Sequence, residues 1–281
     1  MMQNEISLPP LEVKAEEEVS RQRLHQVIRD SYAVRLWNAK SDQGQVVFTM
    51  GGPSAGANVL IEELQSKGEL PCGERLLVLC SDDIRFLLPE AQSLIAQGHH
   101  TLWPVYHESL MLLDTIIEDI LDAPFRANLV WDTTLTSLKQ ALGAMQRFKA
   151  AGYTVHVRGI LIDPWEALTR SSLRMLETKR VLDRNVLLKL HKKVNTDWQE
   201  YTRHPHLIDS YEFKGVMFGT EVYSDGGEGQ RFVTIASSFA PVGPEAMDQR
   251  LHAVARSILD ENADSRASLF ASYYPNHPAL R

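Results

Sequence analysis

The most restrictive feature of this sequence is a short apolar segment that runs directly into a glycine-rich turn. Residues 46–50 have the β-branched and aromatic composition typical of a strand. The turn is Gly51-Gly52-Pro53-Ser54-Ala55-Gly56, and residues 57–65 are compatible with a helix. This order of strand, loop and helix is that of a phosphate-binding loop. In such a loop glycines turn backbone N–H groups toward phosphate oxygens, and the helix N-terminus adds positive charge.

The loop departs from the usual pattern at two positions. Gly51 and Gly56 have the spacing of G-x-x-x-x-G-K-[ST], but Ala57 stands at the lysine position and Asn58 at the Ser/Thr position. An alanine methyl cannot reach the terminal phosphates, whereas the carboxamide oxygen of Asn58 is an acceptable Mg²⁺ ligand. We therefore expect the loop, Asn58 and Val59 to bind nucleotide, with Asn58 as the candidate metal ligand.

Length and composition suit one large α/β domain, or one domain with appendages. The chain has 281 residues, of which 44% are hydrophobic, and its formal net charge of −7 gives no electrostatic case for nucleic acid. No apolar run reaches transmembrane length and the N-terminus lacks a signal-peptide core. We expect no membrane partner and a cytoplasmic location, either in the producing cell or in a target cell after delivery.

Cysteine and histidine positions give no sign of a metal site or a disulfide framework. The two cysteines, Cys72 and Cys80, have no partners at ligand spacing, and a reducing compartment fits them. The histidine pairs at 99–100 and at 204 and 206 have no acid or cysteine at ligand spacing, so they are interpreted as loop residues.

Strand-like and helix-like segments alternate between residues 46 and 163, which predicts a parallel sheet flanked by helices. The expected strands are 46–50, 76–80, 128–132 and 153–162, and the expected helices are 17–37, 57–65, 110–120, 137–150, 165–180 and 184–201. A further helix is expected after residue 83, broken near Pro89 and continuing to about residue 96. Two further strands, 207–223 and 231–238, joined by a hairpin-type connection, and a helix over 244–259 follow. We expect a helical lead-in (1–40), an α/β domain (41–203) and a C-terminal hairpin and helix (204–281) packed on that domain.

Acidic residues follow two of the expected strands. Asp82 and Asp83 come directly after residues 76–80, and Asp132 ends the strand over 128–132. The carboxyl ends of parallel strands form the ligand-binding edge of such sheets. The same acids can also cap the next helix or fill a turn, and Glu108 can be an acid favoured by a helix N-terminus, so the pattern alone leaves these interpretations open.

Taken in order, the motifs resemble the zeta toxin family of P-loop kinases. After the glycine-rich loop they are Asp82-Asp83-Ile84-Arg85-Phe86-Leu87-Leu88-Pro89-Glu90, His107-Glu108-Ser109, Asp132-Thr133-Thr134-Leu135-Thr136, Lys149-Ala150-Ala151-Gly152-Tyr153, and then Arg170, Arg174 and Arg180. The resemblance covers roughly residues 46–195. It implies a P-loop kinase-like parallel sheet flanked by helices, with the C-terminal hairpin and helix as an extension.

The resemblance also implies an activity. It is transfer of the γ-phosphate of ATP or GTP, with Mg²⁺, to a hydroxyl of a small nucleotide-type metabolite. UDP-N-acetylglucosamine is the acceptor of the best-known members, and a nicotinamide dinucleotide is the second candidate. A toxin or effector of this kind implies an antitoxin or chaperone protein as partner.

Phosphoryl transfer depends on positioning and charge neutralisation, and the resemblance assigns roles on that basis. Asp82 fits a general base that accepts the substrate hydroxyl proton, with Asp83 as the fallback. Arg170 and Arg180 fit neutralisation of the transferring phosphate. The positions implied to face the acceptor are Asp83, Arg85, Glu108, Asp132, Thr134 and Arg174. Besides the helix N-terminal interpretation of Glu108, three of these keep an alternative. Asp132 can support the Mg²⁺ shell instead, Asp132 and Thr134 can be plain turn residues, and Arg174 fits a solvated helix face.

The missing lysine leaves two explanations open. Losing one preorganised donor to developing charge costs on the order of 10²–10³ in rate, so the chain should be a weak or inactive kinase as written. Ala57 is either an inactivating substitution in an otherwise intact kinase or part of a nucleotide-binding pseudokinase that acts as an interaction module. The retained carboxylates and arginines favour the first explanation, and Asn58 mildly favours the second. A polynucleotide kinase fits the net acidity poorly.

Overall fold

The computed structural model describes residues 15–70, 73, 75–96, 103–178, 183–218 and 230–237. The strands are β1 (Lys40–Ser41), β2 (Gln45–Met50), β3 (Leu77–Cys80), β4 (Arg126–Asp132), β5 (Thr154–Leu161), β6 (Ser210–Phe218) and β7 (Gln230–Ser237). The helices are α1 (Ala15–Asn38), α2 (Ala57–Ser66), α3 (Ser81–Leu87), α4 (Pro89–Ala96), α5 (Tyr106–Asp122), α6 (Leu138–Ala150), α7 (Pro164–Thr178) and α8 (Arg184–Tyr201), with a 3₁₀ turn η1 (Trp103–Val105).

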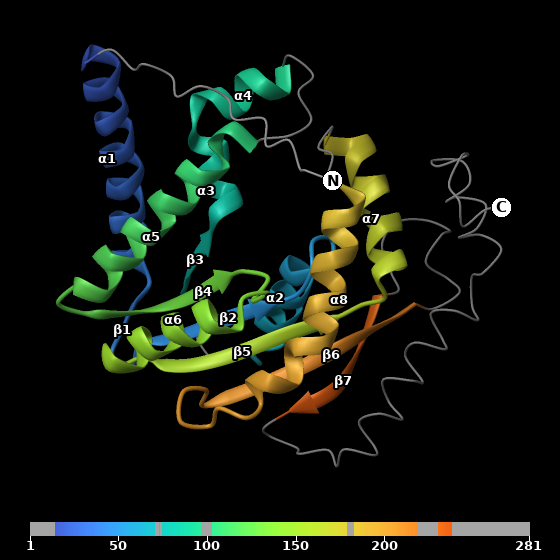
Figure 1. Cartoon of the computed structure of the whole chain (residues 1–281). Coiled ribbons are helices and arrows are strands. Elements are labelled where there is room, and N and C mark those ends of the chain that lie inside the picture. The colour runs from blue at the N-terminus through green and yellow to red at the C-terminus, as the bar shows by residue number, and fades with distance from the viewer. Residues whose placement is uncertain are drawn as a thin grey trace.

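One mixed sheet forms the centre of the molecule (Figure 1). Five of its strands run parallel in the order β3-β4-β2-β5-β6. β1 pairs antiparallel with the start of β4, and β7 pairs antiparallel with β6. β2 therefore lies between β4 and β5, so the loop that follows β2 lies between the loops that follow its two neighbours. This is the position at which parallel sheets bind ligands.

The expected strands and helices are confirmed within the described residues, with shifted bounds. The helix expected over 110–120 begins earlier, at Tyr106, and so includes Glu108. The segment around Pro89 is two helices, because proline fits the first position of α4 but cannot continue α3. The helix expected over 244–259 lies outside the described residues.

β6 is the fifth parallel strand of the sheet, although the sequence placed it in a C-terminal extension. Composition shows that a strand exists but not which strand it pairs with, and β6 turns out to pair with both β5 and β7. The three-part division of the chain stays a prediction.

Two apolar clusters lie on opposite faces of the sheet. In β2, Val46, Phe48 and Met50 join the larger cluster, and Val47 points into the smaller one. The side chains on both faces of β2 are fully buried, which explains why the strand is a continuous apolar run in the sequence. The larger cluster contains side chains of α1, α5, α6 and α8, and the smaller one contains side chains of α2 and α7.

The segment 149–153, one of the family-like motifs, is a helix end rather than part of the ligand edge. Gly152 has φ of 84°, a left-handed conformation that favours glycine. Its N–H donates to Lys149 O and the Tyr153 N–H donates to Phe148 O, which closes α6 immediately before β5. This motif therefore sets the entry to β5.

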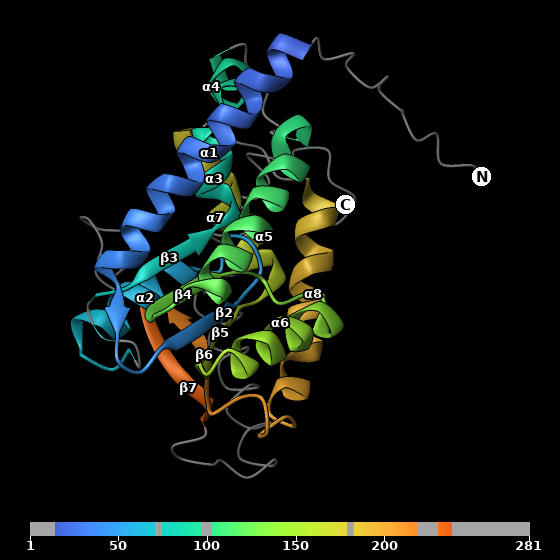
Figure 2. The same cartoon turned by 90° about the vertical axis from the view of Figure 1, so that its left-hand side faces the viewer.

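The long first helix lies on the outside of the molecule, packed against α5 (Figure 2). Its inward residues Ile28, Tyr32 and Leu36 are buried in the larger cluster. Within the part of the chain that the structure describes, no helix combines the length and apolarity needed to cross a membrane.

Candidate active site

The glycine-rich loop has the backbone shape of an anion-binding turn. Ser54 and Gly56 have φ of 63° and 99°, both left-handed, and the Ala55 N–H donates to Gly52 O across the turn. Successive right- and left-handed residues turn consecutive N–H groups into one concavity, the backbone arrangement that binds phosphate. Serine at a left-handed position carries strain that glycine would not.

α2 begins directly after the loop, and its N-cap residue has no side chain that could occupy the N-terminal N–H groups. Gly56 is the N-cap residue, it provides no side-chain cap, and the first turn contains no acidic residue. The helix therefore presents its positive end to the loop. Ala57, at the lysine position, is the first residue of α2, and the exposed Asn58 and Val59 follow it.

Two helices that come later in the sequence, α7 and α8, donate side-chain hydrogen bonds to carbonyl oxygens of the loop. His191 of α8 donates from Nε2 to Pro53 O over 2.8 Å. Arg170 of α7 donates from Nη1 to Ala55 O over 3.1 Å and also pairs with Glu166. The structure thus places Arg170 beside the loop, and its role in neutralising the transferring phosphate stays a prediction.

The other two arginines of that helix are placed differently. Arg174 belongs to α7, one turn beyond Arg170, and Arg180 lies outside the described residues. Their contribution to phosphate neutralisation stays a prediction.

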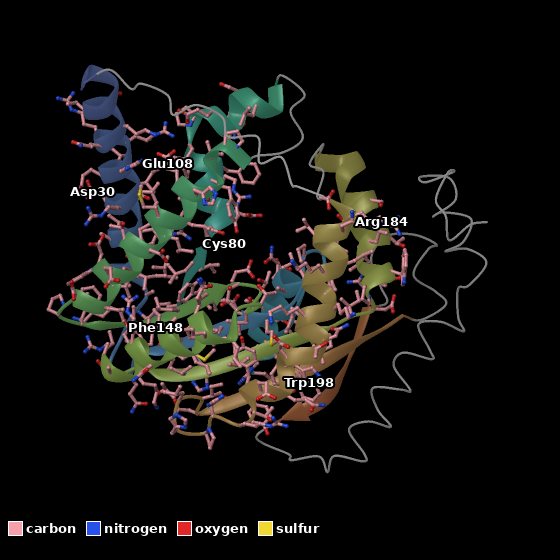
Figure 3. The ribbon with its side chains drawn as sticks, viewed as in Figure 1. Asp30, Cys80, Glu108, Phe148, Arg184 and Trp198 are labelled. Atoms are coloured by element: carbon pink, nitrogen blue, oxygen red, sulfur yellow. The ribbon has the colours of Figure 1, made fainter. Side chains whose placement is uncertain are left out.

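The acids of neighbouring strands meet at the same edge as the loop. Cys80 and Asp132 are register partners at the ends of β3 and β4, and the Cys80 thiol donates to the Asp132 carboxylate. The buried Thr49, at the end of β2, donates from its hydroxyl to Asp132 Oδ1 over 2.9 Å. Figure 3 marks Cys80 at the end of β3.

Burial raises the pKa of Asp132 above its ordinary value. The hydrogen bonds from Thr49 and Cys80 oppose that shift, and the negative charges of Asp82 and Asp83 add to it. Burial likewise raises the pKa of the Cys80 thiol to about 12, so this cysteine stays a neutral donor. The negative charges of Asp82, Asp83 and the partly buried Asp132 therefore make the potential at this edge favourable for a cation.

Asp82 and Asp83 both lie in the first turn of α3, as the sequence order predicted. Asp82 pairs with Arg85 over 3.0 Å, and 44% of its side chain remains exposed. Arg85 is buried, and its guanidinium lies 4.9 Å from the ring centre of Tyr106. Arg85 is therefore placed to orient Asp82, in addition to any contact with an acceptor.

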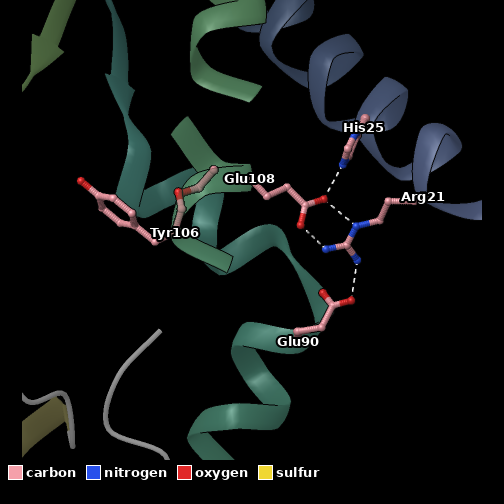
Figure 4. Close-up of polar contacts among 6 residues, drawn as sticks. Arg21, His25, Glu90, Tyr106 and Glu108 are labelled. Atoms are coloured by element: carbon pink, nitrogen blue, oxygen red, sulfur yellow. Dashed lines mark hydrogen bonds and ion pairs between the residues drawn. The ribbon is translucent and has the colours of Figure 1, made fainter. Parts of the chain in front are cut away.

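Glu108 lies in the first turn of α5, and two side chains of α1 contact its carboxylate (Figure 4). Arg21 donates to both of its oxygens and also pairs with Glu90 of α4, and His25 contacts one of them. Burial alone would raise the pKa of Glu108, but the hydrogen bonds and charges of Arg21 and His25 outweigh it and hold the pKa below its usual value. The predicted acceptor-facing acid is thus occupied from within the chain.

The loop after β4 carries Thr134 and is fixed at both ends. Thr133 donates its N–H to Thr49 Oγ1 over 2.9 Å, and Tyr201 of α8 donates its hydroxyl to Leu135 O over 2.6 Å. Leu135 has φ of 48°, a left-handed conformation that is unfavourable for leucine. Thr134 lies between these fixed points, with its hydroxyl 3.2 Å from that of Thr136.

Sequence reasoning missed the residues that hold these loops in place. Among them, His191 and Tyr201 are spaced along the buried face of α8, and a histidine on an apolar helix face was a visible signal. Thr49 and Arg21 gave no comparable signal, because neither stands out from its local pattern and their partners are more than 80 positions away in sequence.

A profile of the zeta toxin family matches residues 30–215, more than half of the chain. The chain belongs to the zeta toxin family. The matched range contains the loop, the acids at the ends of β3 and β4 and both loop-holding helices, α7 and α8. It ends inside β6, which is consistent with the place of β6 in the parallel sheet.

Solved structures with the same fold include one from a toxin–antitoxin system and one of a two-protein complex. The PezAT chromosomal toxin–antitoxin system of Streptococcus pneumoniae has TM-score 0.56 and 11% identity, covering 85% of this chain and 96% of that one. The AvrRxo1-ORF1:-ORF2 complex has TM-score 0.62 and 16% identity, covering 87% and 75%. A structure of that complex with ATP has TM-score 0.60 and 15% identity, covering 78% and 67%. Comparison with curated proteins finds no match. These likenesses confirm the P-loop kinase-like fold.

Proposed function

We propose that this zeta toxin family member binds ATP or GTP with Mg²⁺ and transfers the γ-phosphate to a hydroxyl of a small nucleotide-type metabolite. A UDP-N-acetylglucosamine-like sugar nucleotide is the first candidate acceptor and a dinucleotide the second. One observation carries the proposal. The glycine-rich loop after β2 and the carboxylates at the ends of β3 and β4 lie at the same edge of the sheet. The ATP-containing structure of the related fold supports ATP as the donor.

The proposal assigns each candidate residue a role according to where it lies relative to the loop. The loop N–H groups and the α2 N-terminus hold the phosphates. Arg170 donates to Ala55 O, so to neutralise charge on the transferring group, as proposed, its guanidinium has to turn from that carbonyl toward the phosphate when nucleotide binds. Asp82, half-exposed and paired with Arg85, accepts the acceptor's hydroxyl proton, with Asp83 as the fallback. Arg180 and Arg174 are proposed to add positive charge, and Thr134 to contact the acceptor.

Oxygen ligands at the strand ends fit Mg²⁺. In the described residues, no three side chains of the His, Cys, Asp and Glu types form a metal-binding group. Mg²⁺ usually takes one or two carboxylates and completes its shell with water and phosphate oxygens, so Asp132 and Asn58 suffice as protein ligands. Mg²⁺ would supply charge neutralisation, while Thr49 and Cys80 keep Asp132 oriented toward it.

The missing lysine provides the test of the proposal. Ala57→Lys should raise phosphorylation of a metabolite extract by ATP and Mg²⁺ about 100-fold or more, because it returns a full charge at the terminal phosphates. Adding Asp82→Asn in the same background should remove that gain. A folded Ala57→Lys protein that binds ATP and yields no new phosphorylated metabolite would contradict the kinase proposal.

The second candidate is a nucleotide-binding pseudokinase that acts as an interaction module. Ala57 and the occupied carboxylate of Glu108 favour it. It predicts that Ala57→Lys restores no turnover and that Asp82→Asn leaves the biological effect unchanged.

For either candidate we propose an antitoxin or chaperone partner. The support is that the neighbours named above are a toxin–antitoxin system and a two-protein complex. A cytoplasmic site of action, in the producing or a target cell, stays a prediction.

A further inference from the structure

Side chains of α8 reach three loops at the carboxyl edge of the sheet. His191 donates to Pro53 O after β2 over 2.8 Å. Asn195 donates from Nδ2 to Ile162 O after β5 over 2.9 Å, and Tyr201 donates to Leu135 O after β4 over 2.6 Å. One helix therefore makes side-chain hydrogen bonds to backbone carbonyls behind three adjacent parallel strands.

His191 is the member of this set that contacts the phosphate loop, and its chemistry is constrained. Its side chain is fully buried, and burial lowers its pKa, so the imidazole is neutral. Because Pro53 O can only accept, Nε2 carries the proton and Nδ1 is left as a buried lone pair, with no hydrogen-bond partner among the described residues. A buried nitrogen without a hydrogen-bond partner costs free energy. If residue 191 only had to pack against apolar side chains, an apolar residue would avoid that cost.

The same imidazole explains why residue 52 is glycine. A Cβ placed on Gly52 would lie 2.4 Å from His191 Nε2, well inside contact distance. The imidazole thus lies flat against the loop backbone at Gly52 and bonds the next carbonyl along, at Pro53.

Because the peptide group is planar, fixing the direction of a loop carbonyl also fixes the direction of the N–H that follows it. In a trans peptide the C=O and the following N–H point in opposite directions, and the described residues contain no cis peptide. With Pro53 O turned to His191, the Ser54 N–H points away from α8. With Ala55 O turned to Arg170, the Gly56 N–H points away from α7.

We propose that His191 is a positioning residue of the nucleotide site: it holds Pro53 O outward so that the loop N–H groups face the triphosphate. The inference rests on the proposed function, since it assumes that the loop binds a triphosphate. It adds a role for α8, which the family-like motifs of the sequence do not include.

The test compares His191→Leu, which removes the donor at similar size, with His191→Gln, whose amide N–H can reach the same carbonyl. Calorimetric titration of the full chain with ATP and with inorganic tripolyphosphate measures affinity. We expect His191→Leu to weaken both ligands about three- to tenfold, the range for one lost hydrogen bond, and His191→Gln to restore affinity to within about twofold. Amide hydrogen exchange of residues 52–57 should become faster in His191→Leu and return toward wild type in His191→Gln.

His156→Leu is the matched control. His156 is also buried, bonds Ser210 over 2.7 Å, and has a pKa lowered by burial to about 4, but it lies in β5 away from the loop. This variant should lose stability and keep wild-type affinity and loop exchange. A folded His191→Leu protein with wild-type tripolyphosphate affinity and wild-type loop exchange would overturn the proposal. A wild-type chain that binds neither ligand would overturn it too, but through the proposed function, before any variant is compared.

Discussion

The two sides of the candidate site are held together by different interactions. On the loop side, buried His191 and the largely buried Arg170 bond to backbone carbonyls. On the opposite side, α1 is joined to α4 and α5 by ion pairs between side chains, with Arg21 27% exposed and Glu108 20% exposed. The loop side therefore depends on shape and hydrogen bonding, whereas the α1 side depends on charges that salt and protons reach.

This contrast suggests which side is built to stay fixed. A phosphate-binding loop gains from preorganisation, because its donors must be in place before charge develops. The α1 side covers a predicted acceptor-facing acid, and its contacts are of the kind that solution conditions can weaken. Four experiments can break or sharpen the comparison.

Gly52→Ala should have the largest effect. Its Cβ would meet the His191 imidazole at 2.4 Å, and the fully buried ring has little room to move. We expect a loss of about 2–3 kcal/mol in the free energy of unfolding in urea, together with loss of tripolyphosphate binding. Gly143→Ala is the control, because no atom lies within 4 Å of its added Cβ and it sits within α6, where alanine should stabilise by about 0.5–1 kcal/mol. Equal effects of the two substitutions would contradict the packing of His191 on the loop.

Arg21→Met should follow. It leaves Glu90 without this cation and leaves Glu108 with His25 alone, so we expect a loss of about 1–2 kcal/mol that becomes smaller in 1 M salt. Arg29→Met, on the same helix, breaks an exposed pair with Asp119 and should cost about 0–0.5 kcal/mol. Urea unfolding at low and high salt measures both variants, and a salt-independent Arg21→Met effect would show that charge does not hold α1.

Acid should disturb the loop before it releases α1, because burial lowers the pKa of His191 and the stability of the loop side therefore falls as pH drops below the ordinary histidine value of 6.5. The pKa of Glu108 is held below its ordinary value of 4.5, so its contribution to stability is complete above that value and is lost as pH falls through the lower folded pKa. As pH falls, amide exchange of residues 52–57 should therefore accelerate first, below 6.5, and exchange of α1 should follow only below 4.5. In Arg21→Met the pH dependence of α1 exchange should flatten, and an unchanged profile would remove Glu108 as its source.

Ser54→Gly should have the smallest effect and the opposite sign. Ser54 has φ of 63°, so glycine relieves strain, while its greater freedom in the unfolded chain offsets part of the gain. We expect stabilisation of about 0.5 kcal/mol with unchanged tripolyphosphate affinity, measured by urea unfolding and calorimetry. Destabilisation would mean that the Ser54 side chain makes a contact that the loop needs.

The sequence predicted the fold well because the relevant signals are local. Apolar continuity marked β2 and β3, helical spacing marked α8, and Gly152 marked the end of α6. The order of the motifs placed Asp82, Asp83 and Asp132 at strand ends, where the structure has them. Their catalytic and substrate-binding roles remain proposals.

The sequence did not predict which side chains hold the site in place. A helix face can be recognised from spacing, but the carbonyl that His191 reaches depends on β2 lying between β4 and β5. In the same way, nothing local links Arg21 to Glu108, which is 87 residues away.

By itself, then, the sequence determined the elements, the glycine loop and the strand-end acids, because backbone preference and periodicity act over a few residues. Only the tertiary structure decided that β6 completes the parallel sheet, that α8 bonds the loop and that α1 covers Glu108. These features depend on strand order and on contacts between distant segments, which no local pattern specifies.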